Sequence, residues 1–438
     1  MKIFIALILI LLSQIPILTA DIEFPLSEIT ETSNPRPKIG LALSGGGAKG
    51  LAHIGVLKVL ESYNIPIDYI TGTSIGSIIG GLYAIGYSAD EIEELITQLD
   101  WDELLMDKQS RRHLAMEEKD IMARYAVTLP MKDYMPSLPK GLIAGQNFSA
   151  LISDLTLSVH HIKDFSNLPT PFLCVATNIE TGDAVVLDKG YLPDAIRASM
   201  SIPSMFTPIE IDGQLLVDGG LVENFPVAQC RKMGADIVIG VDVGSLYKDR
   251  SMLISLVSIM EQAVGFQNLK SVVDERKLCD ILILPEVDLF RITDFRKADT
   301  LIVLGEKATQ LKSTELEDLT TLLKDFPEVF RYLPVKDVDS VYVKKIKTVG
   351  LDKVSKNLII GKLGLKDSRW IKSEEIRDAI QRLCGSNYFE RVTYRLEPVP
   401  GGVNMIIRVV EKTTNFFQVG LNYNCELNAA LLLNATLR

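Results

Sequence analysis

The strongest chemical signal in the sequence is a serine between two glycines, in the segment Gly72-Thr73-Ser74-Ile75-Gly76. It lies between a predicted strand, PIDYITGTS, and a predicted small-residue helix, IGSIIGGLYAIG. In this strand–turn–helix context, Gly72 and Gly76 permit a tight turn that lifts the Ser74 hydroxyl above the sheet edge. The positive end of the following helix favours negative charge at the same place. Ser74 is therefore the predicted nucleophile.

A second glycine-rich segment, SGGGAKG at positions 44–50, follows the preceding predicted strand, KIGLALSG. A phosphate-binding loop requires Lys after its last glycine, but Leu51 follows Gly50 here. A dinucleotide-binding loop requires an acidic residue at the end of the next strand, where this chain has Ser74. Neither kind of loop fits this segment well.

The interpretation that fits best is an oxyanion hole made by the backbone of Gly45, Gly46 and Gly47. Neighbouring parallel strands place their carboxyl ends side by side, so the Gly46 and Gly47 amides can point at a carbonyl that Ser74 attacks. A pair of such donors contributes roughly a few kcal/mol to transition-state stabilisation.

The serine also needs a base. The chain has four histidines, which lie in an amphipathic helix or in polar segments: His53, His113, His160 and His161. None of them ends a strand, so a Ser-His-Asp triad is poorly supported. Asp218 does end an apolar strand, LLVDGG, and Gly219-Gly220 permit a tight turn around it. Because burial raises the basicity of a carboxylate, Asp218 is the predicted general base, with an ordinary Asp-Gly turn as the alternative.

These three motifs, in this order, resemble the patatin-like phospholipase family from Lys38 into the 230s. The resemblance implies a Ser–Asp dyad of Ser74 and Asp218 acting on acyl esters of glycerolipids, with neither metal nor organic cofactor. The motif glycines outside the oxyanion loop are Gly50, Gly72, Gly76, Gly219 and Gly220. Lys49 stands where many members carry Arg, which keeps the charge but changes its shape.

The elements that position these motifs alternate between strand and helix, which predicts an α/β sheet, mostly parallel and covered on both faces. With the resemblance, the expected fold is a three-layer patatin-like sheet at 38–312, followed by a helical linker at 313–340. A hairpin is predicted from two neighbouring segments, PFLCVATNIETG and AVVLDKG. An apolar cluster that is either an acyl site or simply core comprises Met200, Ile202, Met205 and Phe206.

The rest of the chain points to export. The chain has 438 residues and a net charge of −10, which argues against a nucleic-acid partner. Residues 1–20 are a predicted signal peptide, with Lys2 before an apolar run, and 21–37 a flexible lead-in. Residues 341–412 resemble a POTRA domain, predicted as a β-α-α-β-β unit. Residues 413–438 alternate apolar and polar side chains like two partial strands of an outer-membrane barrel, with a soluble hairpin as the alternative.

The leading hypothesis is an exported lipid acyl hydrolase with a phospholipid or other acyl-ester substrate. It would be placed in the periplasm, the outer membrane or the cell surface, as in bacterial outer-membrane patatin-like proteins. One alternative is an assembly or secretion factor in which the POTRA module is the functional part. A second is a serine peptidase or thioesterase. The sequence leaves open whether the chain forms a homo-oligomer.

Overall fold

The computed structural model describes residues 36–107, 125, 127–132, 135–136, 141, 143–203, 205–244, 250–254, 259, 262, 266, 270–326, 338, 340–386, 388–412, 415–424 and 428–436. The predicted signal peptide, most of the lead-in and His113 lie outside the described residues. Within the described part of the chain, no helix has both the length and the apolar character needed to cross a membrane.

An eight-stranded sheet forms the centre of the first domain, and the predicted α/β class is confirmed. Its strands in spatial order are β10 (Ile281–Ile283), β9 (Ile237–Val241), β1 (Ile39–Leu43), β2 (Tyr69–Thr73), β5 (Phe172–Asn178), β8 (Gln214–Asp218) and β7 (Ile209–Ile211), and β6 (Ala184–Leu187) also pairs with β5. The five strands from β10 to β5 are parallel. The predicted hairpin is the antiparallel pair β5 and β6.

The remaining pairs qualify the expectation of a mostly parallel sheet, because β8 runs antiparallel to β5 and β7 antiparallel to β8. This reversal still brings the two predicted dyad residues together. On β5, Val175 pairs with Thr73, and the next residue, Ala176, pairs with Asp218. Only β5 therefore separates the end of β8, which carries Asp218, from the end of β2, where the turn that carries Ser74 begins.

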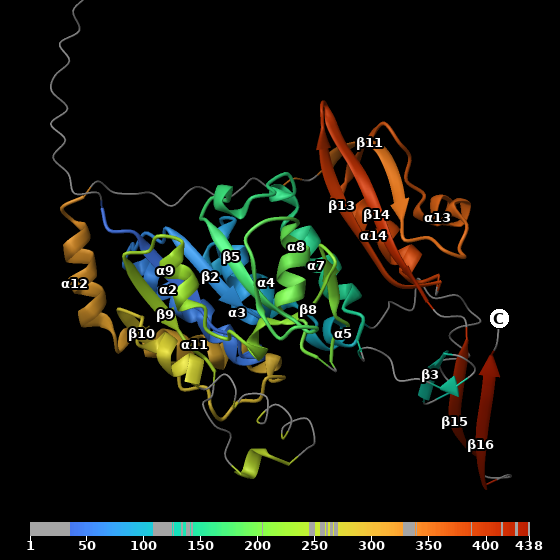
Figure 1. Ribbon diagram of the computed structural model, residues 1–438, viewed down its shortest axis with the longest axis horizontal. Coiled ribbons are helices and arrows are strands. Elements are labelled where there is room, and N and C mark those ends of the chain that lie inside the picture. The colour runs from blue at the N-terminus through green and yellow to red at the C-terminus, as the bar shows by residue number, and fades with distance from the viewer. Residues whose placement is uncertain are drawn as a thin grey trace, which may run out of the picture. The chain divides into compact units, whose positions relative to one another are not determined.

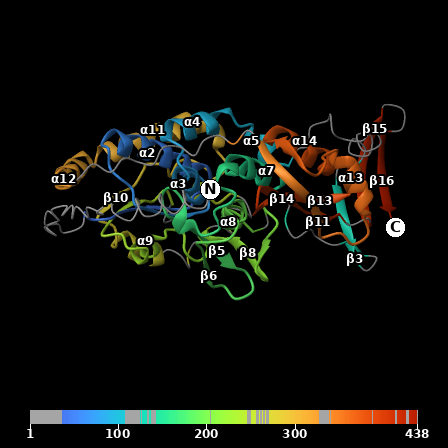
Figure 2. The ribbon, with the colours of Figure 1, turned by 90° about the horizontal axis from the view of Figure 1, so that it is seen from above.

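Helices cover both faces of this sheet, as expected. Alternate residues of β1 show this, because Leu41 and Leu43 belong to the large core while Ala42 belongs to a smaller core with Val227 and Cys230. Figure 2 shows α2, α3, α4 and α11 on one side and α9 on the other. The helices are α2 (Ala52–Ser62), α3 (Ile75–Ala84), α4 (Ala89–Gln98), α5 (Trp101–Leu105), α7 (Gln146–Leu155), α8 (Leu192–Ser199), α9 (Val227–Lys232), α11 (Ala298–Gln310) and α12 (Ser313–Leu323).

A separate small domain follows, in which two helices pack on a four-stranded sheet of order β12-β11-β14-β13. Its elements are β11 (Ser340–Val349), α13 (Lys356–Leu363), β12 (Arg369–Lys372), α14 (Ser373–Cys384), β13 (Phe389–Val399) and β14 (Gly402–Glu411). The predicted β-α-α-β-β order was wrong in one respect: it missed β12. This strand has only four residues, too few to show an alternating pattern, and it leads directly into α14.

The C-terminal segment forms two antiparallel strands, β15 (Phe416–Asn424) and β16 (Asn428–Thr436). Two strands that the sequence did not predict, β3 (Val127–Lys132) and β4 (Met135–Pro136), extend this sheet, with β3 beside β15 (Figure 1). The side chains of Leu431 and Leu433 are 61% and 62% exposed, whereas Gln418 is buried and bonds Thr128 and Asn434. Leu431 and Leu433 therefore lie on an exposed face of this sheet, and Gln418 and Asn434 lie on the opposite face.

Candidate active site

Ser74 occupies the turn between β2 and α3 in a strained backbone conformation, with φ of 53° and ψ of −122°. Both flanking glycines are required by close packing of the backbone. A Cβ added at Gly72 would lie 2.4 Å from the Gly76 carbonyl oxygen, and one at Gly76 would lie 2.4 Å from that of Leu43. The turn can therefore form only with glycine at these two positions. It places Ser74 at the N-terminal end of α3, as the sequence predicts.

The structure brings Ser74 and Asp218 together although they are 144 residues apart in the sequence. The Ser74 hydroxyl donates to Oδ2 of Asp218 at 2.7 Å, and the Gly220 amide donates to Oδ1 at 2.7 Å. Both side chains are nearly inaccessible, with 6% and 5% exposed. Burial raises the pKa of Asp218 to about 6, against the lowering effect of these two hydrogen bonds. The carboxylate is thus a stronger base than an ordinary aspartate.

Three of the four histidines are described, and none of them bonds this pair. His53 is fully buried in α2, and its Nε2 lies 2.9 Å from the Ser44 carbonyl oxygen. Burial lowers the pKa of His53 to about 4, so this ring is neutral at physiological pH. His160 bonds the Leu157 carbonyl through Nδ1. His53 is therefore a packing residue of α2 and not a base for Ser74.

The glycine loop lies beside Ser74, but Gly45 does not act as predicted. Its amide donates to the Asn224 carbonyl at 3.0 Å, so it is not free to bind an oxyanion. No hydrogen bond within the described residues uses the amides of Gly46 or Gly47. These two amides are therefore the loop donors available to an oxyanion. Gly45 instead lets the loop pack closely against its neighbours, since a Cβ there would lie 2.5 Å from Asn224 Oδ1 and 3.1 Å from Ser74 Cβ.

The other predicted glycines also allow close packing around the dyad. A Cβ at Gly50 would lie 2.1 Å from Ile75 Cγ2, so this glycine lets the loop pack against the start of α3. One at Gly219 would lie 2.2 Å from the Val175 carbonyl oxygen, which sets how closely the Asp218 turn approaches β5. Lys49 is 5% exposed and lies in the 3₁₀ turn Gly47–Leu51.

Sequence reasoning missed Ser199, which holds the backbone of Ser74. Its hydroxyl accepts from the Ser74 amide at 3.0 Å and donates to the Val175 carbonyl at 2.6 Å. Ser199 is the last residue of α8 and is completely buried. No motif could have indicated it, because it is an isolated serine 125 residues from Ser74.

We expect Ser199→Ala to lower kcat about tenfold, because the strained turn loses the contact that orients Ser74. The Ser74 amide would be left buried without its acceptor, which costs about 1–3 kcal/mol of unfolding free energy. Steady-state ester hydrolysis and urea unfolding measure the two effects. Ser62→Ala, at the end of α2, removes a comparable hydroxyl-to-carbonyl bond as a control. Equal effects of the two substitutions would contradict the positioning role.

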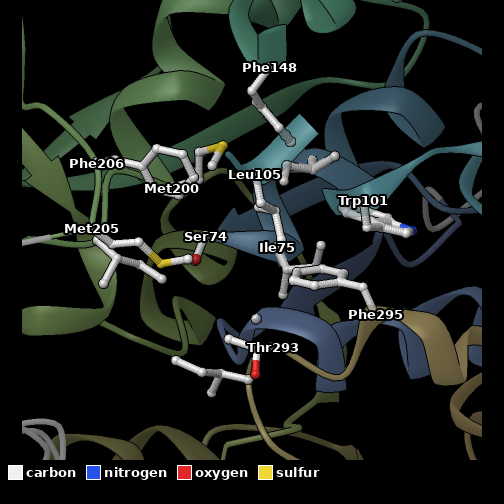
Figure 3. Close-up of a pocket in the computed structure, with 14 residues that line it drawn as sticks. Ser74, Ile75, Trp101, Leu105, Phe148, Met200, Met205, Phe206, Thr293 and Phe295 are labelled. Atoms are coloured by element: carbon white, nitrogen blue, oxygen red, sulfur yellow. The ribbon is translucent and has the colours of Figure 1, made fainter. Parts of the chain in front are cut away.

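Ser74 opens into an apolar pocket of about 470 Å³, including its open mouth (Figure 3). The predicted apolar cluster of Met200, Ile202, Met205 and Phe206 lines one part of it. The other walls come from segments that the sequence did not connect with the site: Trp101, Leu105, Phe148, Ile292, Thr293 and Phe295. Among the described lining residues, Ser74, Thr293 and Trp101 alone carry a side-chain oxygen or nitrogen, and the Trp101 nitrogen is bonded to the Ile96 carbonyl. The pocket therefore suits a hydrocarbon chain attached to a carbonyl at Ser74.

Family comparisons agree with this geometry. A model of the patatin-like phospholipase family matches residues 41–231, and a POTRA model, described as a surface antigen variable number repeat, matches residues 341–412. The chain thus contains a patatin-like phospholipase domain and a POTRA domain.

Fungal lysophospholipases are among the relatives with curated names. Lysophospholipase NTE1 of Phaeosphaeria nodorum is 34% identical over 213 residues, and that of Coccidioides immitis is 37% identical over 210 residues. Each match covers 48% of this chain but only 12% of the relative.

Among solved structures, VipD from Legionella pneumophila has a TM-score of 0.37 at 15% identity, covering 66% of this chain and 68% of VipD. The type III effector ExoU has a TM-score of 0.30 at 16% identity, covering 66% and 54%. These low scores carry no weight for function.

Proposed function

We propose that this chain, with its patatin-like phospholipase domain, is a serine hydrolase that cleaves acyl esters of glycerophospholipids through Ser74 and Asp218. The observation that carries the proposal is the 2.7 Å bond between the Ser74 hydroxyl and the buried Asp218 carboxylate at an apolar pocket. The fungal relatives named lysophospholipase support the same substrate class.

The reaction follows from the positions of these groups. Asp218 Oδ2 takes the hydroxyl proton as Ser74 Oγ attacks the ester carbonyl, and the Gly46 and Gly47 amides receive the oxyanion. Each amide donor contributes about 3 kcal/mol to transition-state stabilisation. When the tetrahedral intermediate collapses, protonated Asp218 gives its proton to the departing alcohol or lysolipid. Asp218 then deprotonates a water that attacks the acyl-Ser74 ester, which releases the fatty acid and restores the hydroxyl.

The pH dependence follows from the Asp218 pKa. Only the carboxylate form can accept the proton, and burial places the pKa at about 6. We expect kcat/KM to be level above pH 7 and to fall about tenfold per pH unit below pH 6. A pH–rate profile on a soluble ester measures this. A limb governed by an ordinary aspartate near pH 4 would contradict the assignment.

The direct test combines a fluorophosphonate reagent with defined phospholipids. We expect the reagent to label Ser74, identified by peptide mass spectrometry, and phospholipids to release fatty acid. Labelling without lipid turnover would support the thioesterase or peptidase alternative instead. No labelling and no turnover would contradict hydrolase function altogether.

We also propose export to the cell envelope. The N-terminal signal pattern, the POTRA match and the exposed Leu431 and Leu433 of β16 support this placement. The POTRA match also favours the second candidate, an assembly or secretion factor. Ser74→Ala separates the two functions. A loss of lipid cleavage together with the cellular phenotype supports the hydrolase, whereas an unchanged phenotype supports the assembly role.

A further inference from the structure

Two aromatic residues that the proposed chemistry does not use face each other in the pocket. The rings of Trp101 and Phe295 stack with their centroids 4.1 Å apart and an interplanar angle of 18°. Trp101 begins α5, and Phe295 begins the 3₁₀ turn Phe295–Lys297. Both side chains are at most 8% exposed, and both line the pocket that Ser74 lines.

The stack lies at the far side of the pocket from the nucleophile. Figure 3 shows Ser74 and Met205 on one side, Trp101 and Phe295 on the other, with Ile75 and Leu105 between them. The Trp101 indole nitrogen donates to the Ile96 carbonyl at 3.2 Å, so the polar atom of the ring is already bonded within the protein. The far side therefore presents hydrocarbon surface alone to a ligand.

Neighbouring contacts hold both rings in place. The Ala48 amide donates to the Ile292 carbonyl at 2.8 Å, which ties the segment carrying Phe295 to the glycine loop. Next to the stack, Arg296 forms an ion pair with Asp102 of α5. These two contacts join the segment that carries Phe295 to the glycine loop and to α5.

We infer that this pocket takes the acyl chain of the substrate and that the Trp101–Phe295 stack is its end wall, which sets the length of the chain that is cleaved. This inference rests on the proposed function and adds the length-determining residues. A chain that reaches the stack buries all its methylenes, whereas a longer chain must bend or displace an aromatic ring.

The first test measures kcat/KM of the full chain for p-nitrophenyl esters from butanoyl to hexadecanoyl. Since each additional buried methylene is worth roughly a fourfold gain, we expect Trp101→Ala and Phe295→Ala to raise the hexadecanoyl-to-butanoyl ratio by about tenfold or more. Trp370→Ala is the matched control, because it removes the other tryptophan of the chain, which is 66% exposed on β12. An unchanged ratio in both pocket variants would overturn the inference.

A second measurement is independent of turnover. In a Ser74→Ala, Trp370→Phe chain, Trp101 is the only tryptophan, and we expect its fluorescence to change as dodecanoate is added. A Ser74→Ala, Trp101→Phe chain should show no such change. If no ester is hydrolysed, the proposed function fails and this titration alone decides the inference. If the alanine variants do not fold, the fluorescence titration likewise decides the inference. An unresponsive Trp101 overturns the inference.

Discussion

Ser74→Ala is expected to reduce kcat for ester hydrolysis by roughly a millionfold, the largest effect of any single substitution in this chain. The alanine leaves no oxygen to form the acyl-enzyme, although the pocket and the glycine-loop amides remain. Losing the hydroxyl also removes a hydrogen bond that lowers the pKa of Asp218, so that pKa should rise further. Fatty-acid release from a defined phospholipid and fluorophosphonate labelling measure the loss.

The control for this prediction is Ser166→Ala, which removes an exposed serine hydroxyl bonded to Asp164. Its activity should equal that of the unaltered chain. Circular dichroism of the Ser74→Ala protein should be unchanged, since alanine fits the space of serine. Turnover within tenfold of the unaltered chain would show that another residue is the nucleophile.

Asp218→Asn should have opposite effects on activity and stability. We expect kcat to fall by about 10⁴-fold, because the amide cannot accept the Ser74 proton. The folded-state pKa of about 6 lies above the ordinary value of 3.8, so ionisation opposes folding above pH 4 and does so fully above pH 6. At pH 8 the asparagine protein should therefore be more stable by up to about 3 kcal/mol, a gain that disappears near pH 4.

Asp242→Asn offers a matched control with the opposite sign. Asp242 is also a buried carboxylate, but Oδ2 bonds Arg276 at 2.6 Å. Removing that charge leaves the guanidinium without its partner, so this substitution should destabilise the fold. Urea unfolding of both variants at pH 4.5 and pH 8 measures the contrast. A loss of stability in Asp218→Asn at pH 8 would contradict the raised pKa.

The chemistry at the centre of the site was predictable because its requirements are local. A turn that places Ser74 between β2 and α3 leaves no space for a Cβ at Gly72 or Gly76, and this demand appears directly as a glycine pattern. Asp218 was predictable for a similar reason, because its place at the end of an apolar strand can be recognised within a short segment of sequence. The alternation of strands and helices predicted the α/β class, since buried parallel strands and amphipathic helices have distinct periods.

Contacts between distant segments could not be predicted in this way. Gly45 looked equivalent to Gly46 and Gly47, but only folding places the Asn224 carbonyl against its amide. Ser199 and the Trp101–Phe295 stack belong to segments without a chemical motif, and the strand pair β3–β15 joins residues about 290 positions apart. Residue types and spacing thus predicted the pair Ser74 and Asp218 and the fold class. Which amides of the glycine loop remain unbonded, and which residues line the pocket, depend on distant segments meeting in the fold, which local sequence patterns do not encode.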